Sequence, residues 1–228
     1  MKIAIITGGE TGERDISIKS ARNVQSLIDF AETELFVFPE EKESFVDRVK
    51  IFDLAIPVIH GAGGEDGTIQ KIFKSLNIPF IFSDVYTHEI GIDKIKTKSV
   101  VKELGIISPS ETDIYPLFAK PRFGGSSVAS KLCNIPEDFS VLVKDNPGIE
   151  LIKETPIKGC EFTVGVVEYK GRNIVLPVIE IIPKGEFFDF ENKYDPDKLA
   201  TEICPANIDV KLSEEVQKQA LLVHTHLK

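Results

Sequence analysis

The chain has 228 residues, 42% of them hydrophobic, and a formal net charge of −9, which allows one large core or two small ones. The acidic balance argues against a general nucleic-acid surface, because such a surface needs a basic face to displace counterions from phosphates. The longest apolar stretches, at 54–59 and 174–182, are too short to cross a bilayer, so no membrane span is expected.

The N-terminus and the cysteines point to an intracellular protein without cross-links. Met1 leads directly into a strand pattern, without the apolar core and cleavage site of an export signal, which predicts a cytoplasmic location. The cysteines at 133, 160 and 204 lie far apart, so neither a disulfide framework nor a zinc site is expected.

The first part of the chain alternates apolar runs with segments of helical period, which predicts an α/β domain with an open, largely parallel sheet over residues 1–85. The predicted strands are 2–7, 34–38, 54–59 and 79–82, and the predicted helices have their apolar faces at 21–28, 45–49 and 69–76.

Residues 86–228 have a different texture, which predicts a second domain of α+β type with antiparallel strands. A helix over 93–104 is expected to end at Gly105, and a last helix is expected to be capped by Ser213. The predicted strand runs are 117–120, 150–153, 161–167 and 173–182, with a turn at Lys170-Gly171.

A lysine followed by a small-residue loop stands at 119–128, Ala-Lys-Pro-Arg-Phe-Gly-Gly-Ser-Ser-Val. Glycines let the backbone approach a ligand, and serine hydroxyls and N–H groups can surround phosphate oxygens while Lys120 neutralises them. The order differs from a Walker motif, since the lysine precedes the glycines. The segment is either a phosphate loop or a flexible surface loop.

Two further loops follow predicted parallel strands. His60 opens the Gly-rich loop 60–67, where the start of a helix can attract an anion and the histidine can bond a carboxylate or phosphate. Loop 8–17 carries Glu13, which can hold an ammonium group, with Arg14 and Asp15 fixing the loop. Each loop also fits an ordinary turn with solvated charges.

Taken together, these loops resemble the D-alanine–D-alanine ligase family, and the similarity runs from residue 2 to about residue 228. The matching motifs, in the family's order, are Gly8-Gly9 with 13–17, 60–67 with Gln70, Asp93-Lys94 with Thr97-Lys98, Lys120-Pro121 with 125–128, Gly159 with Glu161, Pro177 with Glu180 and Pro183, and Phe187 with Lys193-Tyr194.

The resemblance implies an ATP-grasp architecture, with a central lobe at about 106–170 and a partial C-terminal lobe at about 171–228. ATP would phosphorylate the carboxylate of one D-alanine, and the amine of a second would attack the acyl phosphate, as one step of peptidoglycan precursor synthesis. Such phosphoryl transfer depends on positioning and charge neutralisation. Family members are often homodimers, which is an analogy.

Residue roles carried over from the family divide into nucleotide contacts and substrate contacts. Lys94, Lys120 and Lys193 would contact the ATP phosphates, with Lys193 on a mobile lid. On the base and sugar side, Glu154 would meet the adenine amino group, Glu161 the ribose hydroxyls, and Phe187 would pack near the base.

The substrate roles belong to four residues. Glu13, Ser126 and Tyr194 would form a hydrogen-bonded cluster that ties the lid to the substrate site, and His60 would meet the carboxylate or acyl phosphate of the first D-alanine. Tyr194 favours D-alanine as the second substrate, since relatives that make D-alanyl-D-lactate usually differ there. Lid closure would exclude water.

The family's magnesium-binding segment, a strand with Arg and Asp and then Glu-x-Asn, is expected after the last helix, and the sequence ends at Lys228. No metal ligand is therefore assigned, and the chain as given is expected to be weakly active or inactive. Two alternatives stay open: a short, non-catalytic nucleotide-binding module, or an ATP-grasp ligase for another carboxylate.

Overall fold

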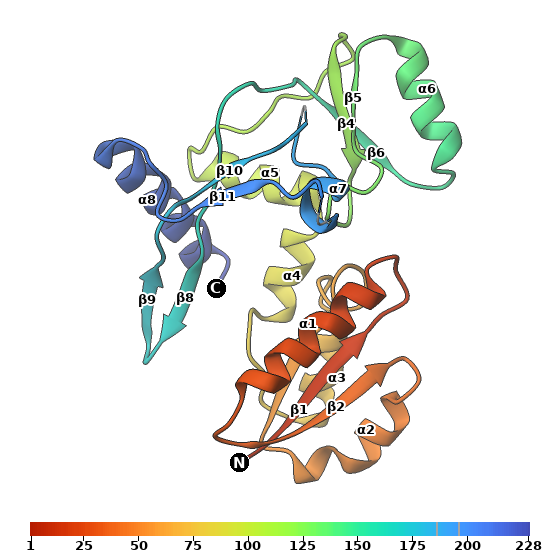
Figure 1. The fold of residues 1–228 in the computed structure, drawn as a ribbon, viewed down its shortest axis with the longest axis vertical. Helices are drawn as coiled ribbons and strands as arrows, with labels where there is room; N and C mark the ends of the chain where they lie inside the picture. Colours follow the sequence, from red (N-terminus) through yellow and green to blue (C-terminus); the bar gives the residue numbers. More distant parts are fainter. Residues whose placement is uncertain (186, 196) are drawn as a thin grey trace. The chain divides into compact units, whose positions relative to one another are not determined.

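The computed structural model describes residues 1–185, 187–195 and 197–228, and its backbone divides into two compact units, Met1–Asp93 and Lys94–Lys228 (Figure 1). The sequence-based boundary at residue 85 and the subdivision near residue 170 stay predictions. Within the described part of the chain, no helix is long and apolar enough to span a membrane.

The first unit is a three-layer α/β/α arrangement around a parallel sheet of order β2-β1-β3. Helix α1 covers one face, and α2 and α3 cover the other. The elements are β1 (Lys2–Gly8), α1 (Arg14–Leu27), β2 (Glu32–Phe38), α2 (Lys42–Arg48), a 3₁₀ turn η1 (Val49–Ile51), β3 (Leu54–Val58), α3 (Thr68–Leu76) and α4 (Val85–Gly91).

The central strand β1 explains why the sheet is covered on both sides. Ile3 and Ile5 face the α1 side and pack with Ala21, while Ala4 and Ile6 face the α2 and α3 side. Successive side chains of a strand point to opposite faces, so a strand buried on both faces reads as a continuous apolar run. The sequence of β1 is such a run.

Phenylalanine rings fill the layer between the sheet and helices α2 and α3. Phe45, fully buried on α2, has its ring centroid 5.4 Å from Phe36, 5.8 Å from Phe38, 6.0 Å from Phe73 and 6.3 Å from Phe52. Edge-to-face contacts of this kind add to the burial of the rings. This ring cluster fixes α2 and α3 on the sheet.

The second unit begins with α5 (Lys94–Glu103) and a three-stranded antiparallel sheet of order β5-β4-β6. Its strands are β4 (Leu117–Pro121), β5 (Lys131–Cys133) and β6 (Leu151–Glu154), and α6 (Pro136–Asp145) packs on one face. Leu117, Ala119 and Cys133 form the core of that face with Leu142 of α6.

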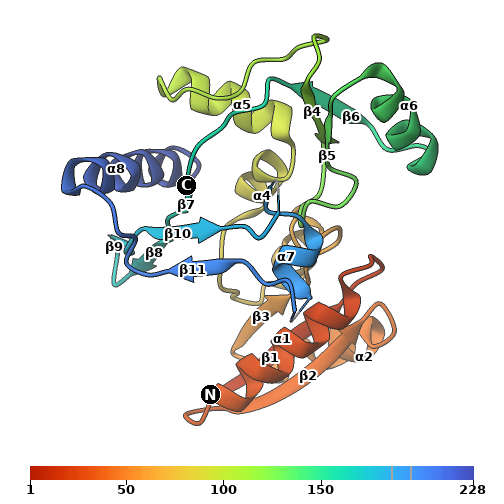
Figure 2. The same cartoon turned by 45° about the horizontal axis from the view of Figure 1, so that its top comes forward.

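The rest of the second unit holds a second antiparallel sheet, of order β11-β10-β7, and a hairpin of β8 and β9 next to α8 (Figure 2). The elements are β7 (Glu161–Thr163), β8 (Val166–Tyr169), β9 (Arg172–Val175), β10 (Ile179–Ile182), α7 (Phe190–Tyr194), β11 (Thr201–Ile203) and α8 (Val210–His226).

The fold class predicted from the sequence is confirmed: a parallel α/β sheet comes first and antiparallel α+β structure follows. Gly105 ends α5 as expected, with φ +74° and its N–H on the Lys102 carbonyl at 3.0 Å. The hairpin turn is also confirmed, since Lys170 and Gly171 both have positive φ, as a type I′ turn requires.

The strand predicted at 79–82 was wrong. Phe80 makes only an isolated parallel bridge to Ala55, and Phe82 leaves the extended region with φ +74°. An extended segment that turns this way after one bridge cannot continue the ladder.

The long strands predicted at 161–167 and 173–182 were each wrong, because each is two strands. Residues 164–165 and 176–178 lie outside the strands. The β8–β9 hairpin ends in the bond from the Leu176 N–H to the Gly165 carbonyl at 2.9 Å, and the next residue, Pro177, has no N–H to donate. The last helix was also predicted with the wrong cap, since Asp209 accepts from the Lys211 N–H at 2.8 Å and the helix begins at Val210.

We predict that Phe45→Ala destabilises the protein by about 3–5 kcal/mol, because it removes a buried ring and leaves a cavity among four others. Urea unfolding followed by circular dichroism measures the change. Phe30→Ala is the matched control, since Phe30 is 70% exposed and its truncation should change the free energy of unfolding by less than about 0.5 kcal/mol. Equal effects of the two substitutions would contradict the assigned core.

Candidate functional site

The face of the β5-β4-β6 sheet opposite α6 carries a different set of side chains from the core face. On β4, Phe118 and Lys120 alternate with the core residues, and on β6 Ile152 and Glu154 do the same. The strand register pairs Phe118 with Glu154 and Lys120 with Ile152, and such directly opposed residues share a face. This face therefore joins a lysine, a carboxylate and an aromatic ring.

Glu154 is the buried charge of this face, only 2% exposed. Its Oε2 lies 2.5 Å from Nζ of Lys120, and its Oε1 lies 2.9 Å from Nζ of Lys98 on α5. A buried carboxylate is unfavourable unless it is paired and hydrogen-bonded. Two ammonium groups around one carboxylate satisfy that requirement and leave the three side chains with a net charge of +1.

Lys98 is a site residue that the sequence-based assignment missed. A signal was present: Lys94 and Lys98 are four residues apart on one helix, and residues at that spacing share a helix face. The Nζ of Lys94 donates to the Gly124 carbonyl at 2.8 Å. Helix α5 thus brings one lysine to the carboxylate and another to the small-residue loop.

The small-residue loop that follows β4 has an unusual backbone. Gly124 has φ +89°, and Ser126, Ser127 and Ala129 have φ between 52° and 57°. Left-handed conformations are uncommon for residues other than glycine and mark sites where the surrounding structure holds the chain. The N–H groups of Val128 and Ser130 turn back to the carbonyls of residues 125 and 127.

Side chains of segment 187–195 hold this loop. Tyr194 OH lies 3.0 Å from Ser126 Oγ, and Lys193 Nζ donates to Ser127 Oγ at 3.3 Å. Ser127 Oγ in turn donates to the Phe188 carbonyl at 2.7 Å. The structure therefore brings together three of the predicted site residues, Ser126, Lys193 and Tyr194.

Asn192 is a second residue that sequence reasoning missed. It is 5% exposed, its Oδ1 accepts from the Lys184 N–H at 2.6 Å, and its own N–H and Nδ2 both donate to Asp189 Oδ1 at 2.8 Å. The Ala200 N–H donates to the Asn192 carbonyl at 2.9 Å. This buried amide fixes the turn that presents Lys193 and Tyr194.

Two predicted nucleotide contacts lie in different surroundings. Phe187 packs edge-to-face on Phe118, with ring centroids 5.1 Å apart, and so joins the face that holds Lys120 and Glu154. Glu161 is exposed at the start of β7 and pairs with Ile181 of the other sheet. The roles given to these residues, and to Glu154 on adenine, stay predictions.

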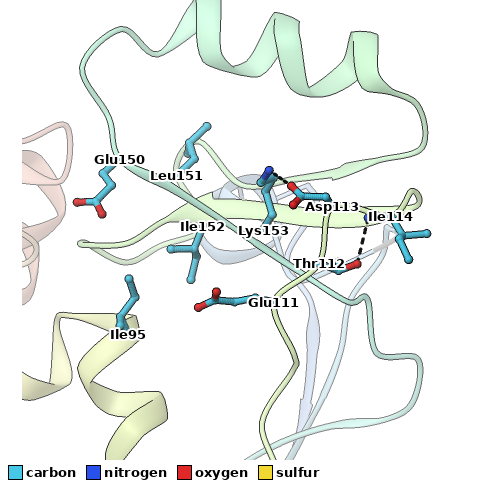
Figure 3. Close-up of a pocket in the computed structure, with 9 residues that line it drawn as sticks. All are labelled: Ile95, Glu111, Thr112, Asp113, Ile114, Glu150, Leu151, Ile152 and Lys153. Carbon is cyan, nitrogen blue, oxygen red and sulfur yellow. Dashed lines mark hydrogen bonds and ion pairs between the residues drawn. The ribbon is translucent and has the colours of Figure 1, made fainter.

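A surface pocket of about 570 Å³ opens beside the edge strand β6 (Figure 3). Its lining carries the carboxylates of Glu111, Asp113 and Glu150 and one lysine, Lys153, which pairs with Asp113. The full lining is Ile95, 111–114 and 150–153. Asp113 and Glu150 are each in an ion pair, the latter with Arg122 at 3.1 Å, so the lining offers no surplus of positive charge for a phosphate.

In the first unit, the loops after β1 and β3 lie side by side. The buried Ser17 hydroxyl accepts from the His60 N–H at 2.9 Å and donates to the Glu13 carbonyl at 3.1 Å. Glu13 is 7% exposed, and its Oε2 lies 2.9 Å from where a Cβ on Gly61 would stand. The two predicted substrate residues, Glu13 and His60, are thus held by the same contacts.

Arg14 braces the first loop, as the sequence suggested. Its Nη1 donates to the carbonyls of Gly9 and Phe38, at 2.8 and 3.0 Å, and its Nη2 pairs with Glu40 at 2.9 Å. A guanidinium can bind several oxygens in a fixed geometry. The side chain of Arg14 therefore holds the segment that carries Glu13 against the loop after β2.

His60 is a half-buried imidazole with an acidic neighbour. Its Nδ1 lies 3.8 Å from Glu65 Oε1, and its Nε2 lies 3.3 Å from Ser20 Oγ. Interaction with the Glu65 carboxylate raises the pKa of His60, and the charge of Glu13 acts in the same direction. The same interaction lowers the pKa of Glu65. A protonated His60 suits a ligand carboxylate or phosphate.

Magnesium is implied by the family, and the described residues do not form a site for it. Over 1–185, 187–195 and 197–228, no group of three or more His, Cys, Asp or Glu side chains gathers as a metal site. Magnesium is normally held by carboxylates together with substrate phosphates.

Comparisons with known proteins agree with this geometry. Residues 90–228 match the family model described as the D-ala D-ala ligase C-terminus. The chain is 36% identical to the D-alanine–D-alanine ligase of Clostridium perfringens (strain SM101 / Type A), over all of this chain and 80% of that protein.

Solved structures show the same fold. The D-alanine–D-alanine ligase of Bacillus anthracis has a TM-score of 0.82 and 30% identity, covering 100% of this chain and 79% of that one. Its complex with ATP has a TM-score of 0.80 and 27% identity over 100% and 78%. The VanG D-Ala:D-Ser ligase of Enterococcus faecalis has a TM-score of 0.79 and 25% identity over 99% and 82%.

The fold, the lysine-rich face and these likenesses define the class of the protein as an ATP-dependent carbon–nitrogen ligase of the ATP-grasp type. Phosphate-binding side chains and a braced loop are the parts that such chemistry requires. Within this class, the chain belongs to the D-alanine–D-alanine ligase family.

We predict that Glu65→Gln lowers the pKa of His60 toward its usual value of about 6.5. A raised histidine pKa stabilises the fold fully below the unfolded pKa and loses this effect as pH rises through the folded pKa. The stability difference between wild type and Glu65→Gln should therefore be larger at pH 6 than at pH 9. NMR titration of His60 and urea unfolding at both values measure this.

Glu32→Gln is the control for this comparison, since Glu32 has a 71% exposed side chain that pairs with Lys2. It should leave the His60 titration unchanged. A His60 pKa that is the same in Glu65→Gln and wild type would show that the two side chains are not coupled.

Proposed function

We propose that this chain binds ATP on the second unit and joins two D-alanines to D-alanyl-D-alanine, with release of ADP and phosphate. ATP phosphorylates the carboxylate of the first D-alanine, and the amine of the second displaces phosphate from the acyl phosphate. One observation carries this proposal: Lys98 and Lys120 meet around the buried carboxylate of Glu154 in a chain that resembles D-alanine–D-alanine ligases along its whole length.

Phosphate binding is assigned to lysines on a sheet face and a loop. Glu154 directs the amines of Lys98 and Lys120 to one place, at 2.9 and 2.5 Å, and the pair keeps a net positive charge that a phosphate can use. Preorganised charges of this kind stabilise a transferring phosphoryl group without reorganisation during the reaction. Lys94, next to Gly124, adds a third amine.

The lid is assigned to segment 187–195. The contacts Ser126–Tyr194 and Ser127–Lys193 join it to the small-residue loop, which supports the proposal that Lys193 meets the γ-phosphate when the lid is closed. An acyl phosphate hydrolyses in water, and a closed lid protects it. This geometry supports a role for Tyr194 in holding the lid.

The first D-alanine is assigned to the paired loops of the first unit. The carboxylate of Glu13 suits the ammonium group of the amino acid, and the protonated imidazole of His60 suits its carboxylate. Ser17 and Glu65 hold the two groups. The adenine and ribose contacts proposed for Glu154, Phe187 and Glu161 complete the set.

Magnesium, when bound with ATP, would neutralise phosphate charge. The described residues supply no site for it, so no step is assigned to the metal here. A cytoplasmic location is proposed because ATP and the precursors of peptidoglycan are found there. A homodimer is proposed by analogy with the family alone.

The direct test is an ADP-release assay on the full-length gene product with ATP, magnesium and D-alanine, with chromatography of the product. We expect D-alanine-dependent ADP release and one dipeptide per ADP. D-serine and D-lactate, offered with D-alanine, test the second substrate, since one similar structure is a D-Ala:D-Ser ligase.

Other outcomes would support the alternatives. ATP binding without ADP release under any of these conditions would indicate a nucleotide-binding module. ADP release that requires a different carboxylate, with none in D-alanine, would indicate an ATP-grasp ligase of other specificity. Either result would overturn the proposed substrate.

We predict that Lys120→Met lowers kcat/KM for ATP by about 100-fold or more, as expected when a group that stabilises transition-state charge is removed. Lys153→Met is the matched control, because Lys153 is on the same sheet but points to the other face and pairs with Asp113. It should stay within about twofold of wild type, the range of an exposed ion pair. Equal losses would contradict the assigned face.

We predict that Tyr194→Phe raises the KM for D-alanine about threefold to tenfold, because one hydrogen bond between lid and loop is lost. Steady-state kinetics with varied D-alanine measures this, and the free energy of unfolding should change little. Tyr169→Phe is the control, since Tyr169 is 59% exposed in the β8–β9 hairpin. Unchanged kinetics in Tyr194→Phe would remove the hydroxyl from the lid.

A further inference from the structure

Helix α4 makes side-chain contacts with the loop that carries His60, and no role has yet been given to them. His88, near the end of α4, has its Nδ1 3.2 Å from the Glu65 carbonyl and its Nε2 3.1 Å from Gln70 Nε2. Gln70, on α3, also donates from Nε2 to the Gly64 carbonyl at 2.9 Å. His88 and Gln70 thus bind two consecutive carbonyls of the loop.

The orientation of the Gln70 amide determines which ring nitrogen of His88 accepts a hydrogen bond and which donates one. Gln70 is 1% exposed, and its Nε2 has two neighbours that accept, the Gly64 carbonyl and His88 Nε2. A flipped amide would place its oxygen against the Gly64 carbonyl, which is repulsive. The amide nitrogen therefore donates to the Gly64 carbonyl, and the contacts of His88 fit the tautomer that accepts at Nε2 from Gln70 and donates from Nδ1 to the Glu65 carbonyl.

This arrangement leaves the side-chain oxygen of Gln70 without a hydrogen bond from the residues that the structure describes. Within the described part of the chain, the buried Oε1 of Gln70 has no hydrogen-bond partner. Buried acceptors are nearly always satisfied, so each exception calls for an explanation. Here the explanation is that both amide protons are needed by the loop and by His88.

The loop itself leaves little freedom at these carbonyls. A Cβ on Gly64 would lie 2.0 Å from the Ile59 carbonyl oxygen, so the backbone there runs directly against the end of β3. Asp66 closes the other end, since its carboxylate accepts from the N–H groups of Gly63 and Thr68, both at 2.9 Å. The Glu65 backbone is thus held at its N–H, which donates to the Gly61 carbonyl at 2.9 Å, and at its carbonyl, which contacts His88 Nδ1 at 3.2 Å.

Two ion pairs connect α3 with α4 and with the residue that precedes it. Lys74 pairs with Asp84 at 2.6 Å, and Lys71 pairs with Glu89 at 2.6 Å. Both pairs are exposed on the surface, where such contacts contribute little to stability. They therefore add little to the docking of α4, and the Gln70–His88 contact is the part that reaches the loop.

We propose that His88 is a positioning residue for the substrate loop: by binding the Glu65 carbonyl and Gln70, it sets the position of the Glu65 carboxylate beside His60. His88 itself touches no reacting atom. The inference rests on the proposed function only in its kinetic readout, because the His60–Glu65 pair can be observed without any reaction.

The link from His88 to His60 has two steps. His88 fixes the backbone of Glu65, and the side chain of that residue then faces His60 Nδ1 at 3.8 Å. The charged groups that face His60 are Glu65 from its own loop and Glu13 from the β1–α1 loop, and both raise its pKa. A Glu65 that moves away weakens the first and larger of these effects.

The test compares two substitutions at His88 that separate shape from hydrogen bonding. His88→Leu fills a similar volume and removes both bonds, whereas His88→Asn keeps an N–H donor near the Nδ1 position. NMR titration of His60 in each protein gives its pKa, and steady-state kinetics gives the KM for D-alanine and for ATP.

In His88→Leu, we expect a lower pKa of His60 and a KM for D-alanine raised about threefold to tenfold, the effect of one lost hydrogen bond. The KM for ATP should stay within about twofold, because the phosphate-binding residues lie in the other unit. His88→Asn should restore both values most of the way. Rescue by a conservative variant is not expected of a residue that only fills space.

Lys74→Met is the control for the docking of α4, since it breaks the exposed pair with Asp84 and touches no loop carbonyl. It should leave the titration of His60 and both KM values unchanged. Should His88→Leu fail to fold, Gln70→Glu gives a second comparison, because it replaces the amide that donates to His88 and Gly64 by a carboxylate.

Some results would overturn the proposal. If His88→Leu lowers the free energy of unfolding while the His60 pKa and the KM for D-alanine stay at their wild-type values, His88 is structural only. If no D-alanine-dependent ADP release is found in any variant but the His60 pKa falls in His88→Leu, the positioning role stands and the proposed substrate fails.

Discussion

Burial of the Glu154 carboxylate is the constraint on which the second unit's functional face depends. A carboxylate that is only 2% exposed has to be paired, and its two partners come from different elements, Lys120 from β4 and Lys98 from α5. Because both lysines must reach the same group, α5 and the β5-β4-β6 sheet are held in one arrangement. Lys94 is then brought to the small-residue loop by helix geometry alone.

In the first unit, one buried side chain likewise joins two parts of the candidate site. Its apolar layers fix the parallel strands, and the loops at the carboxyl ends of β1 and β3 are then joined by a single buried hydroxyl, Ser17. Ligands of open α/β sheets bind at this edge. The polar groups Glu13 and His60 lie there because strand order puts the ends of β1 and β3 side by side, and local hydrogen bonds orient them.

Much of the fold could be predicted because periodicity reports burial directly. β1 reads as an apolar run since both its faces are covered, and Gly105 and Lys170-Gly171 act through local backbone geometry. The predictions failed where a longer-range effect decided. The strand expected at 79–82 depended on the backbone of Phe82. The long runs after residue 160 are interrupted at 164–165 and 176–178, where the β8–β9 hairpin ends in the bond from the Leu176 N–H to the Gly165 carbonyl.

For the site, the motifs selected loops and side chains whose roles stay predictions, and the comparisons show the family. Lys98, Asn192 and His88 were missed because their importance lies in a partner distant in sequence: Glu154, Lys184 and Glu65 respectively. A residue that orients another through a single hydrogen bond leaves no motif of fixed spacing in the sequence. Glu154 was predicted only as a contact for adenine. Because its carboxylate is buried, it also needs the two lysines as ion-pair partners.

The backbone of the small-residue loop after β4 has a consequence for its flexibility. Three residues with side chains, Ser126, Ser127 and Ala129, adopt the conformation that glycine adopts most easily, at roughly 1 kcal/mol each. Glycines there would relieve this strain, yet they would let the free loop sample many shapes. Side chains at these positions therefore restrict the conformations open to the loop, in exchange for strain in the folded backbone.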